Sequence, residues 1–257
     1  MGPAGQRLSD LVPEFGRHIS DCGLIINEVV YFLLDRWGHL LENMDQPYLT
    51  QDNLRLMADA VREKGCPLST CFGFIDGTLI QSCRPTYNQK ELYNGKDRCH
   101  GLKYQSLVTP NGLVANLYGP VEGRRHDAVL FRESKLANKI ENLIHYDGSP
   151  LVVYGDKAYP LCSSVITPFR GVCLSDEEKQ FNLKMNSCRI AVEWAFAKLA
   201  ANFSFVKYAP NQKVYLQPVA MYYKLATLLT NCHTCLYGSQ VSDYFGVAPP
   251  NLEDYLL

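Results

Sequence analysis

The stretch LVVYGDKAYPL, residues 151–161, decides the fold class. Its first four residues are apolar and rich in β-branched side chains, which predicts a buried strand that Gly155 ends. Asp156 then places a carboxylate at the strand end. Such an aspartate is either a turn residue, which hydrogen-bonds the backbone two residues on, or a functional group at a sheet edge. Carboxylates elsewhere in the chain decide between these interpretations.

Other segments complete the pattern around this strand. CFGFIDGTLIQSC, residues 71–83, has the aromatic and β-branched content of a strand, and residues 103–119 predict a hairpin that turns at Pro110-Asn111-Gly112. Helical spacing follows in residues 126–143, 186–203 and 216–236, with Asn186 or Ser187 as the expected N-cap of the second. The order strand, strand, strand, helix, strand, helix, helix predicts a mixed α/β domain.

The first part of the chain is predicted to be helical. A short helix is expected to end at Gly16, a long one to begin near Ser20, and a third to run from a Thr50 cap to Gly65. Pro13 is expected to break the first helix. We expect three parts: a helical segment at 1–66, the α/β domain at 67–236 and a C-terminal tail at 237–257.

Composition restricts the class of protein. The chain of 257 residues is 47% hydrophobic and 20% charged, and its net charge of −1 argues against a basic coat. The first ten residues form no apolar signal, and charges interrupt the most apolar segment, residues 24–37. We expect a soluble intracellular protein with no membrane contact. The ten scattered cysteines are then expected to be reduced, with Cys232 and Cys235 in the core rather than on zinc.

Three carboxylates fit one chemical design. Asp76 follows an apolar strand and precedes Gly77, and Asp156 follows an apolar strand and Gly155. Glu193 lies within the predicted helix of residues 186–203. Glu193 has a second interpretation, an i,i+4 ion pair with Arg189. Clustered carboxylates repel one another, and divalent ions such as Mg²⁺ remove that conflict. Two ions about 3.5–4 Å apart can promote phosphodiester cleavage.

The sequence resembles the PIF/Harbinger transposases, which are DDE superfamily endonucleases. The matching blocks occur in the family's order within residues 72–203: FIDGTLI, LKYQSLVTPNGLV, GRRHDAVLF, GDKAYPL, TPF, QFN and SCRIAVEWAFAKLAANF. The resemblance implies an RNase H-like domain that cleaves and joins DNA strands with Mg²⁺ or Mn²⁺, two ions in all. Asp76, Asp156 and Glu193 match the family's acidic triad.

Auxiliary residues surround this triad. Asp127 is expected to be an N-cap and is also a candidate metal ligand, and Arg124 and Arg125 beside it fit DNA phosphate. The segment from Arg84 to Lys103 has an excess of positive charge and interleaved tyrosines, so it is either a DNA contact or a solvated loop. Its candidate DNA-binding residues are Lys90, Lys96, Arg98 and Lys103.

Three functions remain open from the sequence. The first is a transposase-derived, metal-dependent DNA endonuclease in the nucleus. The second is a domesticated, non-catalytic protein that binds DNA or another protein, and the third is a stand-alone metal-dependent nuclease or phosphatase. The N-terminal helices resemble half of a helix-turn-helix. However, the acids Asp21 and Glu28 lie on the face that would read DNA, so we expect these helices to pack against the domain instead. A separate DNA-binding partner and a homo-oligomer also remain open.

Overall fold

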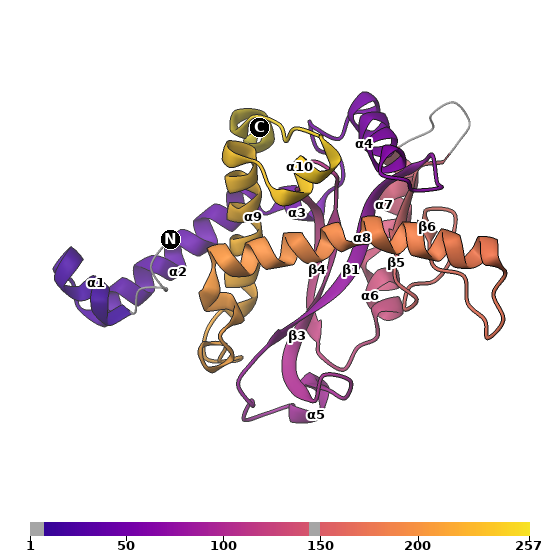
Figure 1. Ribbon diagram of the computed structural model, residues 1–257. Helices are drawn as coiled ribbons and strands as arrows, with labels where there is room; N and C mark the ends of the chain where they lie inside the picture. Colours follow the sequence, from indigo (N-terminus) through magenta and orange to yellow (C-terminus); the bar gives the residue numbers. More distant parts are fainter. Residues whose placement is uncertain (1–7, 144–149) are drawn as a thin grey trace.

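A six-stranded mixed sheet forms the centre of the molecule (Figure 1). The structure is a computed structural model that describes residues 8–143 and 150–257. The first seven residues, on which the expected lack of an apolar signal partly rests, lie outside the described residues. The sheet order is β2-β3-β1-β5-β6, with β4 beside β3. The strands are β1 (Cys71–Gln81), β2 (Tyr93–Asn94), β3 (Cys99–Val108), β4 (Val114–Glu122), β5 (Val152–Gly155) and β6 (Val165–Ile166).

The strand directions confirm the predicted class. β1, β2 and β4 are antiparallel to β3, whereas β5 is parallel to both β1 and β6. Antiparallel neighbours need only short turns, and the parallel β5 follows a helical crossover, as the strand-helix-strand pattern requires. The result is a mixed α/β fold, consistent with an RNase H-like architecture.

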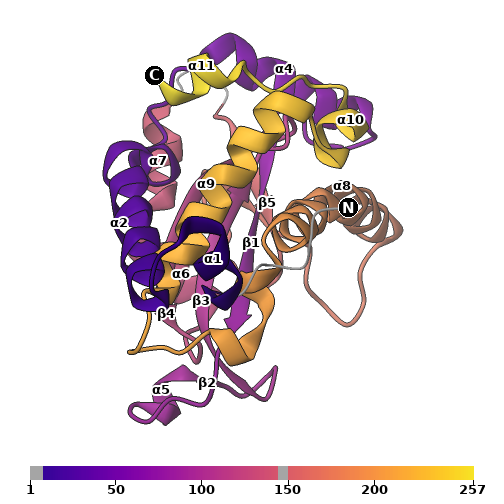
Figure 2. The same ribbon diagram turned by 90° about the vertical axis from the view of Figure 1, so that its left-hand side faces the viewer.

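Helices lie on both sides of the sheet. In Figure 2, α8 lies on one side of the sheet and α2, α6 and α7 lie on the other. The helices are α1 (Leu8–Phe15), α2 (Ile19–Trp37), α3 (His39–Glu42), α4 (Gln51–Glu63), α5 (Gln89–Leu92), α6 (Asp127–Ser134), α7 (Leu136–Leu143), α8 (Asp176–Asn202), α9 (Val219–Tyr237), α10 (Gln240–Phe245) and α11 (Leu252–Leu256); 3₁₀ turns occupy Ser204–Lys207 and Ala209–Asn211.

Two helix boundaries differ from the prediction. The segment 126–143 is not one helix, because Lys135 adopts a left-handed backbone (φ 53°) and separates α6 from α7. The expected cap of α8 at Asn186 or Ser187 is wrong. The helix begins at Asp176 after Ser175, which forms a reciprocal capping box with Glu178.

The N-terminal helices follow the pattern with two corrections. His18, rather than Ser20, caps α2, and its ring accepts a hydrogen bond from the Ser20 amide. Pro13 does not break α1, which is short enough for one missing backbone hydrogen bond to be tolerated. Thr50 caps α4 as predicted, with its hydroxyl accepting from the Asn53 amide.

The last residues pack against the body of the protein. Residues 237–257 were expected to be a tail, but they contain α10 and α11. The Phe245 ring stacks on Phe74 of β1 at 5.9 Å, and the Trp37 indole donates to the Leu256 carbonyl at 3.1 Å. All ten cysteines are free. Among the described residues, no helix has the length and apolar character needed to cross a bilayer.

Candidate active site

Asp76 and Asp156 lie side by side on neighbouring strands. β1 and β5 are parallel, and their last paired residues are Ile75 and Gly155. The next residues in the chain direction are Asp76, which lies within β1, and Asp156, which directly follows β5. Side chains alternate between the two faces of a strand, so both aspartates continue on the same face of the sheet. The proximity expected from the sequence is therefore present.

Asp76 is a largely buried acid with specific partners. Arg189 of α8 donates from Nη1 to its Oδ2 at 2.8 Å, and the Gly77 amide donates to its Oδ1 at 2.9 Å. The pKa of Asp76 is raised to about 6, chiefly by burial and also by the charges of Asp156 and Asp127, while Arg189 and the Gly77 amide oppose the increase. The sequence paired Arg189 with Glu193, but the structure pairs it with Asp76.

Asp156 has the local geometry of a turn residue. The Ala158 amide donates to Asp156 Oδ1 at 2.8 Å, which is the hydrogen bond two residues on that the turn interpretation predicted. This role does not exclude the functional one, since the Asp156 side chain lies on the same face of the sheet as Asp76. Its negative charge reaches Asp76 and Tyr159, and it contributes to the raised pKa of each.

Glu193 is an exposed residue of α8. It follows Arg189 by four residues, and residues spaced in this way share one side of a helix. Asn186, on the same side, accepts a hydrogen bond from the Tyr154 hydroxyl of β5 at 3.3 Å. This side of α8 therefore faces the ends of β1 and β5, but the structure gives no contact between Glu193 and either aspartate.

Asp127 lies on the other face of the sheet. It is the first residue of α6 and His126 is the N-cap, so the N-cap assignment for Asp127 is wrong. A side chain on Gly77 would overlap the Asp127 carboxylate, which places Asp127 against the face opposite that of Asp76. Lys103 of β3 neutralises it, with Nζ 2.8 Å from Oδ1. That contact is an ion pair without aligned hydrogen-bond geometry. We therefore leave Asp127 out of the metal-ligand set.

The predicted basic residues divide into two groups. Arg125 is held between Glu122 and Glu133 at 2.8 and 2.7 Å, Arg124 lies 3.7 Å from Glu91, and Lys103 is bound to Asp127. In the second group the side chains are exposed and form no ion pair within the described ranges: Lys90, Lys96 and Arg98. Of the predicted basic residues, those of this second group carry charges that no acidic side chain in the described part of the chain neutralises, so they are the ones available to bind a phosphate backbone.

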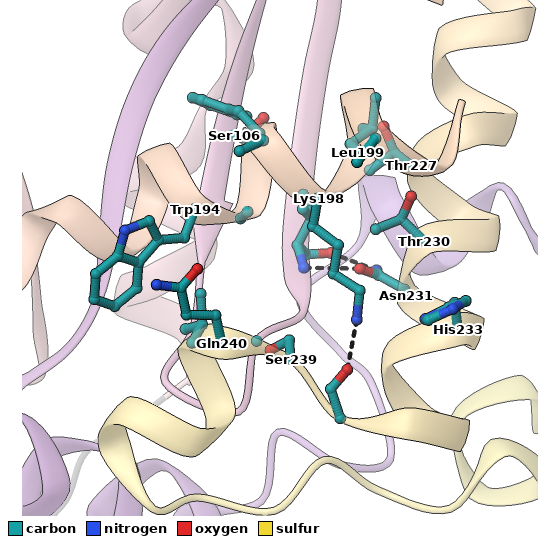
Figure 3. A pocket seen from close by; sticks show the side chains of 18 of the residues that line it. Ser106, Trp194, Lys198, Leu199, Thr227, Thr230, Asn231, His233, Ser239 and Gln240 are labelled. Carbon is teal, nitrogen blue, oxygen red and sulfur yellow. Dashed lines mark hydrogen bonds between the residues drawn. The ribbon is translucent and has the colours of Figure 1, made fainter. Parts of the chain in front are cut away.

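A cavity of about 390 Å³ lies between α8, α9 and α10 (Figure 3). Ser106, which pairs across the sheet with Asp76, lines it, but no carboxylate does. Lys198 donates into its wall, to the Thr234 hydroxyl at 2.9 Å and the Gly238 carbonyl. Burial lowers the pKa of Lys198. Lys198 therefore joins α8 to the end of α9 rather than facing a nucleic acid.

The donor types at the strand ends fit a hard divalent cation. Carboxylate oxygens are the ligands that Mg²⁺ prefers, and Asp76 and Asp156 supply them from a rigid sheet. The arrangement of the described side chains is incomplete, since no three His, Cys, Asp or Glu residues among them lie close enough to hold an ion. Asp76 is instead neutralised by Arg189. A third protein ligand would require a change of side-chain position, and Glu193 is an acid on the side of α8 that carries Arg189.

Comparison with known families decides the relationship. The model of the DDE superfamily endonucleases matches residues 75–231, more than half of the chain. The chain belongs to the DDE superfamily endonucleases. It is also 32% identical over 117 residues to a probable transposase for insertion sequence element IS702 of Microchaete diplosiphon, over 43% of this chain and 39% of that protein. This chain thus matches well under half the length of that relative. No solved structure matches.

One feature of this DDE superfamily endonuclease was missed by sequence reasoning. Tyr159, three residues after Asp156, is fully buried, and its hydroxyl has no hydrogen-bond partner in the described chain. Burial raises its pKa, and the charges of Asp127, Asp76 and Asp156 raise it further, which places the phenol close to all three. Its ring packs edge-on against Phe131 of α6. A tyrosine after a turn has no pattern that separates it from an ordinary core residue.

Proposed function

We propose that the protein is a divalent-metal-dependent DNA endonuclease, derived from a transposase of the PIF/Harbinger type. The observation that carries the proposal is the position of Asp76, within β1, and Asp156, directly after β5, where the parallel pairing of these two neighbouring strands ends. The family membership supports it, because the matched region begins one residue before Asp76 and contains Asp156 and Glu193. Action in the nucleus belongs to the same proposal.

The proposed roles follow from where each side chain lies. Asp76 and Asp156 would hold Mg²⁺ or Mn²⁺, and Glu193 would complete a two-ion set after a change of side-chain position. Bound in this way, such ions activate water for attack on a phosphodiester and stabilise the leaving oxygen. Arg189 keeps the Asp76 carboxylate ionised until a cation replaces it. The exposed cations Lys90, Lys96 and Arg98 would hold the DNA backbone.

A nicking assay on supercoiled DNA tests the catalytic part. We expect Mg²⁺-dependent nicking by the native protein, and a loss of at least about 100-fold in Asp76→Asn and in Glu193→Gln, as expected for groups that stabilise transition-state charge. The matched control is Glu63→Gln, which neutralises an exposed glutamate on α4 and should cleave at the native rate. Equal cleavage by the native protein and Glu193→Gln would remove Glu193 from the site.

Ion binding is tested separately from cleavage. Mg²⁺ that binds only the folded protein stabilises it and so raises the melting temperature. The stabilising free energy is about 2.7 kcal/mol when the free Mg²⁺ concentration is 100 times the dissociation constant. We expect Asp156→Asn to abolish most of this increase, and Asp45→Asn, at an exposed aspartate, to retain it. A melting temperature that does not respond to Mg²⁺ would contradict a metal site.

A second function has its own supporting observation. Arg189 is paired with the Asp76 carboxylate and Glu193 is exposed, an arrangement that a domesticated, non-catalytic binding protein could retain without cost. In that case the protein binds DNA or a protein partner, Mg²⁺ does not stabilise it, and neither Asp76→Asn nor Glu193→Gln changes binding. The nicking assay and the melting titration together separate the two functions.

A further inference from the structure

Helix α2 has one side against the protein and one side without a partner. On the inner side Val30 is buried, and the Asn27 amide oxygen accepts from the Tyr222 hydroxyl of α9 at 2.6 Å. On the outer side Ile25, Val29 and Phe32 have exposed fractions of 44%, 49% and 63%. In Figure 1, α1 and the beginning of α2 extend away from the sheet.

Three of the exposed apolar residues form a line along the helix, and Leu24 and Tyr31, 62% and 51% exposed, lie beside it. Their spacing of four and then three residues keeps Ile25, Val29 and Phe32 on one side, about opposite to Val30 and Asn27. Asp21 lies four residues before this line and Arg36 four residues after it, so each end carries one charge, and the two charges are opposite. Within the described chain, neither charge has an ion-pair partner. We call the five residues 21, 25, 29, 32 and 36 the α2 seam.

The seam is complementary to itself when reversed. Asp21 lies seven residues before Glu28, and Arg36 lies seven residues after Val29. Ile25 lies three residues before Glu28, and Phe32 lies three residues after Val29. An antiparallel copy, related by a two-fold axis between Glu28 and Val29, therefore places Phe32 against Ile25 and Arg36 against Asp21, with Val29 of each copy at the level of Glu28 of the other. The symmetry repeats each contact, as in any isologous interface.

We propose that the protein forms a homodimer through antiparallel pairing of its α2 seams. A line of exposed apolar side chains on the outer side of a helix marks an interface, and its charged ends select the occupant. A parallel pairing would set Asp21 against Asp21 and Arg36 against Arg36. The helix has 19 residues and is about 28 Å long. Two such helices bury an area at the low end for specific complexes, about 1,000 Å², so the dimer dissociates on dilution.

Sedimentation velocity on the full chain, across a dilution series, tests the pairing. We expect a dimer that dissociates on dilution, and a monomer at every concentration for the double variant Ile25→Glu, Phe32→Glu. The matched control is Leu236→Glu, which places the same charge at a 57% exposed leucine near the end of α9. It should dimerise as the native protein does. A native protein that is monomeric throughout, or a dimer that survives the double variant, overturns the proposal.

A charge-reversal cycle tests the antiparallel orientation. These positions are exposed, so their variants should retain the native circular dichroism spectrum. Asp21→Arg and Arg36→Asp should each raise the dimer dissociation constant about tenfold, because two like-charge contacts replace two ion pairs. The combination of both changes restores opposite charges and should return the constant to near its native value. Failure of the combined variant to recover would contradict the antiparallel orientation, whatever the nuclease assays show.

Discussion

Arg189 of α8 and Asp76 of β1 form an ion pair at 2.8 Å, between side chains that are only 20% and 19% exposed. The pair joins residues 113 positions apart in the chain and attaches the longest helix to the strand that carries the proposed catalytic aspartate. Both a structural and a functional expectation follow from this contact.

Removing the guanidinium should destabilise the protein. In Arg189→Met, Asp76 keeps its burial but loses its largest compensating charge, so its pKa rises above the native value and the fold loses about 2–4 kcal/mol at pH 7. Urea denaturation measures the loss. Arg62→Met is the matched control, because its ion pair with Asp59 is exposed and should contribute less than about 1 kcal/mol. Equal effects of the two changes would show that the Arg189 contact is not formed in solution.

The raised pKa of Asp76 predicts a pH dependence of stability. Its pKa is about 6 in the folded protein against an ordinary value of 3.8, so the folded state binds more protons between these values. Stability contributed by this group is complete below about pH 4 and is lost as the pH rises through 6. At about 1.4 kcal/mol per pKa unit, the loss is about 3 kcal/mol.

The comparison that isolates this group is the native protein against Asp76→Asn, both in chelator. The difference in unfolding free energy should move by about 3 kcal/mol in favour of the Asn variant between pH 4 and pH 7. A difference that stays constant across this range would mean that the Asp76 carboxyl titrates normally.

Gly77 should tolerate no side chain. A Cβ there would overlap the Asp127 carboxylate, so Gly77→Ala must displace Asp127 from Lys103 or move the strand. The expected cost is about 1–3 kcal/mol, as for other overpacked interiors. The control is Gly95→Ala, where nothing lies within 4 Å of the added carbon and the backbone is unstrained. Thermal unfolding should separate the two variants, and identical melting temperatures would contradict the placement of Asp127.

DNA binding should depend on the unpaired cations. Replacing Lys90, Lys96 and Arg98 with Ala should weaken binding and flatten the dependence of log affinity on log salt by up to about 0.9 for each phosphate that is no longer neutralised. Arg125→Ala is the control, because Glu122 and Glu133 already neutralise that side chain. Fluorescence anisotropy on a duplex at several salt concentrations measures both slopes. A larger effect of Arg125→Ala would place the DNA on the α6 side of the hairpin.

Local patterns predicted a large part of the fold and of the site. The strand that contains Asp76, the hairpin turning at Gly112 and the strand ending at Gly155 follow from short apolar runs and turn glycines, which act within a few residues. The expectation that the first of these strands ends at Asp76 is wrong, because β1 continues to Gln81 in its pairing with β3. The start of α8 was missed because the apolar pattern is weak in its first turns, and only the Ser175 and Glu178 capping box marks it.

The sequence by itself determined most of the central strands and helices, their order and the acid that follows each of the two apolar runs, since these depend on neighbouring residues. The tertiary structure alone decided which acids meet. Strand pairing placed Asp76 beside Asp156, and alternation along β1 placed Asp127 on the other face against Gly77. The packing of α8 against the sheet pairs Arg189 with Asp76 rather than with Glu193. These outcomes depend on burial and on charges brought together from distant positions, and the energy of a buried carboxylate is set by those neighbours rather than by its place in the chain.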